Sequence, residues 1–196
     1  MIVVVGQPVA TGGRKPRAAG LAVGIARAAV AAGADVQLVG KLGDDPTGDA
    51  VLVDLARGGI GHPVTLRDPA RRTPVGASAI AAGPRPVLEP ADLELALDYV
   101  PDFRVLILTE IEGPDLIPPA VGAANFAGAH LIVLVGTRSE LPSLPATSTV
   151  LASPARGRDG AFASVVADYA VALDAGVDSA DAWREVSARL GAERRG

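Results

Sequence analysis

GADVQLVGKLGDDPTGDAVLVDLARGGIGH, residues 33–62, is the part of the sequence that decides the fold. An apolar run at residues 36–39 leads into the glycine-rich segment GKLGDDPTG, as expected of a buried strand that ends in a tight turn. Apolar residues then recur with helical spacing over residues 50–55, after a capping residue at Asp45 or Thr47. The stretch therefore predicts a strand, a turn and a helix of an α/β domain.

The same alternation continues on both sides of this stretch. Buried strands are predicted at residues 2–5, 36–39, 104–108 and 131–135, with shorter extended runs at 63–66, 74–81 and 149–152. Helices are predicted at residues 18–32, 89–99, 116–128, 161–173 and 179–190. Strands that alternate with helices predict a three-layer, doubly wound α/β sandwich with a mainly parallel sheet. A chain of 196 residues is long enough for one such domain, so residues 1–196 are expected to form a single domain.

Composition excludes several classes of function. Aromatic residues make up only 3% of the chain and the net charge is −4, which disfavours nucleic-acid binding. The chain has no cysteine and two isolated histidines, His62 and His130, so a protein-bound metal site is not expected. No apolar run approaches the length of a membrane span, and the first residues carry no basic leader. The expectation is a cytoplasmic protein.

The glycine-rich turn carries a resemblance to a known family. Gly40, Gly43, Asp45 and Gly48 match the G-x-x-G-x-D-x-x-G pattern of the ribokinase family, the PfkB-type carbohydrate and nucleoside kinases. The flanking segments AGADVQLV and LVDLARGGI resemble the family as well. In that family this turn is mainly architecture, in which glycines permit tight backbone geometry and the aspartate caps a helix.

Two features of the family are missing near the amino terminus. Only residues 7–17 separate the first strand from the next predicted helix, which is too short for the several strands of the family's β-lid. No aspartate precedes Asp35, and Gly24 occupies the position of the family's hydroxyl-binding asparagine. The resemblance is thus to a truncated, divergent member of the family without a β-lid.

The family's phosphate-transfer motif, Gly-Ala-Gly-Asp-x-Phe at a helix start, has its nearest counterpart in GRDGAF at residues 157–162. In this alignment Gly160 takes the place of the catalytic base and Asp159 lies one position early. Gly157, Arg158 and Gly160 would form the anion-binding turn, with Asp159 as the candidate base. An Asp159 that caps its own helix is favoured over one that serves a ligand.

A second alignment stays open. Residues 149–154 can instead be the strand before the family's Asn-x-x-Glu motif, in which case Ala155 and Arg158 occupy its two functional positions. Elsewhere, Glu110 follows a predicted strand and is a weaker candidate for acid–base chemistry.

The resemblance implies a divergent carbohydrate-kinase-family protein with weak or no phosphotransfer that binds a small ligand or a protein partner. The alternative is a compact ATP-dependent sugar or nucleoside kinase with Asp159 as general base. ATP and magnesium are the expected cofactors if kinase activity survives. A small sugar or nucleotide is the expected ligand, and assembly into a homo-oligomer is left open.

Overall fold

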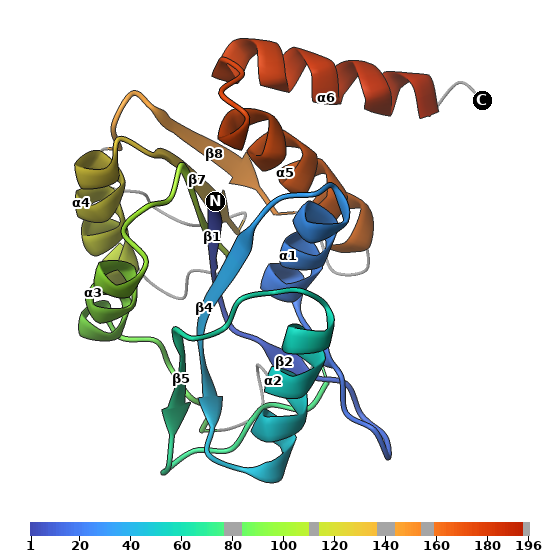
Figure 1. Cartoon of the computed structure of the whole chain (residues 1–196), viewed down its shortest axis with the longest axis vertical. Coiled ribbons are helices and arrows are strands. Elements are labelled where there is room, and N and C mark those ends of the chain that lie inside the picture. The colour runs from blue at the N-terminus through green and yellow to red at the C-terminus, as the bar shows by residue number, and fades with distance from the viewer. Residues whose placement is uncertain (77–83, 110–113, 137–143, 154–158, 194–196) are drawn as a thin grey trace.

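A computed structural model describes residues 1–76, 84–109, 114–136, 144–153 and 159–193. Its central feature is a six-stranded sheet in the order β5-β4-β1-β6-β7-β8, and every neighbouring pair is parallel (Figure 1). The strands are β1 (Ile2–Val5), β4 (Val36–Gly43), β5 (Thr65–Asp68), β6 (Val105–Leu108), β7 (His130–Val135) and β8 (Ser148–Ala152).

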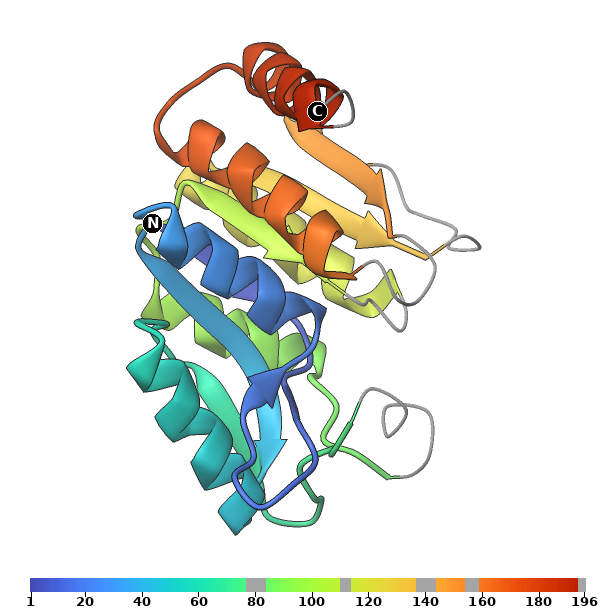
Figure 2. The ribbon, with the colours of Figure 1, turned by 90° about the vertical axis from the view of Figure 1, so that its right-hand side faces the viewer.

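Helices cover both faces of the sheet and complete the three layers. One face carries α1 (Leu21–Ala31), α2 (Pro46–Arg57) and α5 (Asp159–Asp174), and the other carries α3 (Pro90–Tyr99) and α4 (Ile117–Ala127), which follows a 3-10 turn at Pro114–Leu116. The last helix, α6 (Ser179–Glu193), packs outside α5 (Figures 1 and 2). The predicted doubly wound, mainly parallel α/β sandwich is confirmed.

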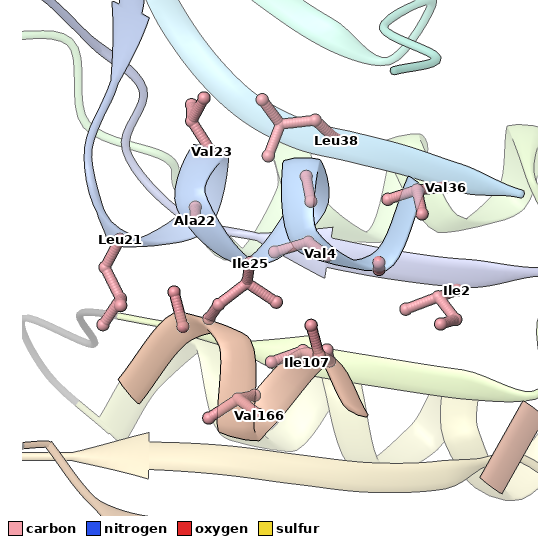
Figure 3. Packing of buried hydrophobic residues seen from close by; sticks show 14 of the residues in the cluster. Ile2, Val4, Leu21, Ala22, Val23, Ile25, Val36, Leu38, Ile107 and Val166 are labelled. Atoms are coloured by element: carbon pink, nitrogen blue, oxygen red, sulfur yellow. The ribbon is translucent and has the colours of Figure 1, made fainter. Parts of the chain in front are cut away.

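The two cores follow directly from the alternation of side chains along the strands. Ile2 and Val4 of β1 point into the core that contains α1 and α5, whereas Val3 and Val5 point into the core under α3 and α4. Figure 3 shows Val4 with Ile25 of α1 in the first core. All four residues of β1 are buried, which is why a continuous apolar run marked this strand in the sequence.

The predicted helices and central strands are present, with shifted ends. The helix expected at residues 18–32 begins only at Leu21, because Ala18 and Ala19 form a strand, and Gly20 turns the chain with a φ of 104°. The strand expected at residues 36–39 continues to Gly43, because residues 40–43 pair in parallel with β5. The first two motif glycines therefore lie in a strand and not in the turn.

The segment at residues 7–17, predicted to be too short for the several strands of a β-lid, contains one short strand, and the partner of that strand lies just after the segment. β2 (Val9–Ala10) pairs antiparallel with β3 (Ala18–Ala19) as a small separate sheet. Such short strands persist because Ala10 is also hydrogen-bonded on its other side, to Pro74 and Gly76. Of the strand predicted at residues 74–81, the structure describes only this bridged start, and residues 77–81 lie outside the described part.

Candidate functional site

The candidate site lies at the carboxyl edge of the parallel sheet, where β1, β4 and β6 end. Helices α1 and α5 both begin near this edge and lie side by side along the sheet (Figures 2 and 3). Ile25 of α1 and Val166 of α5 are fully buried in the same core and fix the two helices against each other. Two helix starts are thereby held at the edge where open α/β sheets bind ligands.

Gly24 lies at the contact between these two helices. A Cβ added to Gly24 would lie 3.3 Å from the Cβ of Ala163 in α5, so even a methyl group would press on the neighbouring helix. The position that the family resemblance assigns to a hydroxyl-binding asparagine is therefore occupied by a helix–helix contact. Gly24 serves packing in this chain.

The predicted anion-binding turn falls only partly within the described residues. Gly157 and Arg158 lie outside them, while Asp159 is the first residue of α5 and Gly160 lies exposed in its first turn. A Cβ added to Gly160 would meet no atom within 4 Å. Helix α5 begins two residues earlier than predicted, which places both residues inside the turn where backbone N–H groups lack helical partners.

The motif glycines Gly40, Gly43 and Gly48 stand where the backbone admits no side chain. An added Cβ would lie 2.5 Å from the Gly6 carbonyl oxygen at Gly40, 2.5 Å from the Thr73 nitrogen at Gly43, and 2.5 Å from the Gly43 carbonyl oxygen at Gly48. All three contacts are with backbone atoms, which cannot move aside as a flexible side chain can. These glycines permit close packing of the chain.

Asp45 connects the turn, helix α2 and the segment around Thr73. Its Oδ1 accepts a 2.7 Å hydrogen bond from the N–H of Gly48, and its Oδ2 accepts a 2.8 Å bond from the N–H of Thr73. Burial by itself would raise the pKa of Asp45, but the bonds from Thr73 and Gly48 outweigh it and leave the pKa below its ordinary value. The structure therefore shows the predicted helix cap, with a second bond that sequence spacing alone does not reveal.

Other polar groups at the edge also hold the backbone in place. The buried hydroxyl of Thr109 donates to the carbonyl of Val5 at 3.0 Å. The amide of Gln7 donates to the carbonyl of Lys41 at 2.7 Å. Neither Gln7 nor Thr109 was proposed as a site residue from the sequence, and the only signal was a polar residue just after an apolar run. Glu110, the weaker acid candidate, lies outside the described residues.

Lys41 forms an ion pair that the sequence does not predict. Its Nζ lies 2.7 Å from Oδ2 of Asp92 in the first turn of α3, and both side chains are mostly buried. Asp92 also accepts a 3.0 Å hydrogen bond from the N–H of Glu89, which caps the helix. The pair joins β4 to α3 across 51 residues of sequence, a separation that no local pattern can indicate.

The two histidines make local hydrogen bonds. His62 Nδ1 lies 3.1 Å from the carbonyl oxygen of Ile60. His130 Nε2 lies 2.9 Å from the hydroxyl of Thr149, which in turn lies 3.0 Å from the hydroxyl of Tyr169. Among the residues that the structure describes, no group of three or more acidic or histidine side chains is arranged to hold a metal ion.

Comparison with known proteins identifies the architecture. No family model matches the chain, and no curated protein matches its sequence. Solved structures do match, including a candidate Ribokinase II from E. coli (13% identity, TM-score 0.54) and an uncharacterized sugar kinase from Pyrococcus horikoshii (14%, 0.52). Aminoimidazole riboside kinase from Salmonella enterica also matches (16%, 0.51). The fold is ribokinase-like.

The ribokinase-like match covers only part of each protein. The aligned regions take in 68%, 70% and 70% of this chain and 52%, 53% and 50% of those three structures, in the same order. The chain thus spans about half the length of the kinases it resembles. Crystal structures of the E. coli protein with ATP and magnesium and of the Salmonella enzyme with aminoimidazole riboside and an ATP analogue show what those proteins bind. In the described part of this chain, no helix is long and apolar enough to cross a membrane.

Proposed function

We propose that residues 1–196 form one ribokinase-like domain that binds a small sugar or nucleotide at the carboxyl edge of its sheet and transfers phosphate weakly or not at all. The observation that carries the proposal is the paired start of α1 and α5 at this edge. The first backbone N–H groups of a helix lack partners within the helix, and they and the helix dipole favour the oxygen-rich, anionic groups of phosphorylated sugars and nucleotides. The matching kinases bind ligands of this class.

Weak phosphotransfer follows from the residues that stand at the reacting positions. In the alignment of residues 157–162 with the family motif, Gly160 takes the place of the general base and has no side chain to accept a proton. Loss of a general base typically costs about 10²–10⁴ in rate. Gly24 offers no group to orient a sugar hydroxyl and faces Ala163. Orientation of the acceptor and removal of its proton are both weakened.

The fit to magnesium and ATP is correspondingly poor. The described residues hold no cluster of carboxylates that would bind a magnesium ion. The sequence also has no counterpart of the Thr-x-Gly-x-x-Gly strand that binds adenosine in the family, and no Walker-type loop. We therefore assign no step of this proposal to a bound nucleotide–metal complex.

A binding screen and a rate measurement test the proposal together. Thermal unfolding followed with ATP, ADP, ribose, fructose, adenosine and ribose 5-phosphate should reveal stabilisation by at least one of them. Phosphotransfer from ATP should stay below the roughly 1 per second expected of an active kinase. Stabilisation by none of these compounds contradicts the binding function.

The compact-kinase alternative gives a distinct outcome in the same assay. If Asp159 is the general base, turnover exceeds about 1 per second and Asp159→Asn lowers it by about 10²-fold or more. Asp168→Asn is the matched control: this partly exposed carboxylate lies nine residues further along α5, pairs with Arg189 of α6, and its loss should leave turnover unchanged.

A further inference from the structure

Helices α3 and α4 lie on the face of the sheet opposite α1 and α5 (Figure 1). A hollow opens between these two helices. Its volume is about 660 Å³, within the range typical of small-molecule sites. Its position on the other face separates it from the edge site proposed above.

The walls of the hollow are mostly apolar and contain two phenylalanines. Phe103 is 3% exposed and lies in the core beneath, whereas Phe126 near the end of α4 is 88% exposed and stands at the rim. Leu97 contributes from α3, and Gly122 and Ala123 leave room along α4. Because the ring of Phe126 is exposed, it contributes almost no hydrophobic stabilisation to the fold. An exposed aromatic ring at the rim is well placed to cover a bound molecule.

Two carboxylates from α3 supply the charge of the hollow. Glu94 and Asp98 are exposed, line the hollow and lie one helical turn apart on the same side of α3. Among the described residues neither has an ion-pair partner, in contrast to Asp92 of the same helix, which Lys41 neutralises. Like charges at this spacing repel each other and destabilise a helix. Helix α4 carries no charged residue to offset them.

We propose that this hollow binds a small organic cation, a protonated amine with an apolar body. The ammonium group would lie by Glu94 and Asp98 and relieve their repulsion, while the apolar body would pack against Leu97 and the wall of α4. The ring of Phe126 adds cation–π attraction. None of the described residues that line the hollow is basic, and its two carboxylates repel anionic sugars and phosphates.

The charge pattern is tested with three ligands of nearly equal shape. Phenethylammonium, 2-phenylethanol and phenylacetate differ chiefly in charge. Titration of each compound into ¹⁵N-labelled protein therefore isolates the contribution of ligand charge to the affinity. Phenethylammonium should shift the amide signals of Gly122 and Ala123 and bind about tenfold more tightly than the alcohol. Phenylacetate should produce no shift at these amides.

Variants then test the residues. Glu94→Gln combined with Asp98→Asn should weaken phenethylammonium binding to the level of the alcohol, and Phe126→Ala should weaken it about two- to fivefold. Glu185→Gln, which removes an exposed carboxylate from α6, is the matched control and should bind as the unaltered protein does. Gly122→Leu should block binding without loss of stability, since a side chain at Gly122 starts from open space and leucine favours helix.

Three results would overturn the proposal. Equal affinity for phenethylammonium and 2-phenylethanol would show an apolar groove without cation recognition. Unchanged affinity in the double carboxylate variant would exclude Glu94 and Asp98 as the recognition groups. No amide shift with any of the three compounds at millimolar concentration would show that the hollow binds no ligand of this class.

Discussion

At the scale of single residues, Asp45 is the most consequential side chain of the glycine-rich turn. It caps α2 through Gly48 and also holds the backbone of Thr73, so one carboxylate satisfies two N–H groups from different parts of the chain. Both bonds require the acceptor form of the carboxylate. The residue therefore stabilises the fold, which is the role that its place in a helix-capping pattern indicates.

Asp45→Ala should lower the free energy of unfolding by about 2 kcal/mol, since it removes a cap worth about 1 kcal/mol and leaves the Thr73 N–H without its partner. Asp45→Asn should cost less, because an amide oxygen can still cap Gly48 while its NH₂ group cannot accept from Thr73. Urea denaturation at pH 7 measures both. Asp35→Asn, which alters an exposed carboxylate, is the control. A similar loss of unfolding free energy in that variant would show that the effect is not specific to Asp45.

At the scale of elements, the structure explains why glycine is required at the end of β4 but not in the middle of α4. Gly43 ends β4 against the backbone of Thr73 and Arg71, while Gly122 lies in the middle of α4 with nothing within 4 Å of an added Cβ. Neither has a positive φ, so the difference is one of space alone. The glycine-rich motif predicts that Gly43 is required, whereas no sequence pattern indicates the role of Gly122.

Gly122→Ala should raise the free energy of unfolding by about 0.5–1 kcal/mol, because alanine favours helix and meets no obstacle here. Gly43→Ala should lower it by about 1–3 kcal/mol, since its methyl group would overlap backbone atoms. Urea denaturation of the two variants measures both changes. A stabilised Gly43→Ala would mean that the β4 end and the Thr73 segment separate more easily than the structure indicates.

The elements that could be predicted from the sequence are those whose signal is local. Continuous apolar runs such as residues 2–5 and 131–135 marked buried parallel strands, and Gly33 marked the end of a helix. The continuation of β4 to Gly43 could not be predicted, because it depends on pairing with β5 and not on side-chain pattern. The small β2–β3 sheet was missed for the same reason.

The candidate site was less predictable than the fold. The turn around Asp45 matched a motif, yet its bond to Thr73 spans 28 residues and the Lys41 pair spans 51. The sequence indicates that Gly24 lacks the hydroxyl-binding side chain expected at its position. It does not indicate the contact of Gly24 with Ala163, which depends on how two distant helices pack. Such contacts are properties of the packed sheet, and a linear pattern carries no record of them.

At the scale of the whole molecule, His130 links the stability of the fold to pH. Its hydrogen bond to Thr149 and edge contact with Tyr169 join β7, β8 and α5, and Tyr169 in turn contacts Trp183 of α6. Burial lowers the pKa of His130 below its ordinary value of 6.5, against the opposing charge of Asp178. The folded protein therefore holds this ring neutral at pH values where the unfolded chain binds a proton.

The free energy of unfolding should fall as the pH drops below about 6.5, because the unfolded state then binds more protons than the folded state. His130→Gln should flatten this dependence, whereas His62→Gln, which alters the other histidine, should keep it. Denaturation in urea between pH 5 and pH 7.5 measures the slopes. Identical slopes for His130→Gln and the unaltered protein would assign the acid sensitivity to other groups.

The central place of β1 in the sheet has a consequence for the order of folding during synthesis. β1 pairs with β4 on one side and β6 on the other, and the hydroxyl of Thr109 reaches back across 104 residues to Val5. A ribosome must therefore extend the chain past β6 before the second edge of the apolar strand IVVV is covered. Until then a nascent chain exposes an unpaired strand edge of the kind that promotes aggregation, and such distant pairing also forms slowly. Nascent chains stalled near residue 100 should consequently bind a general chaperone, and chains stalled beyond residue 150 should release it.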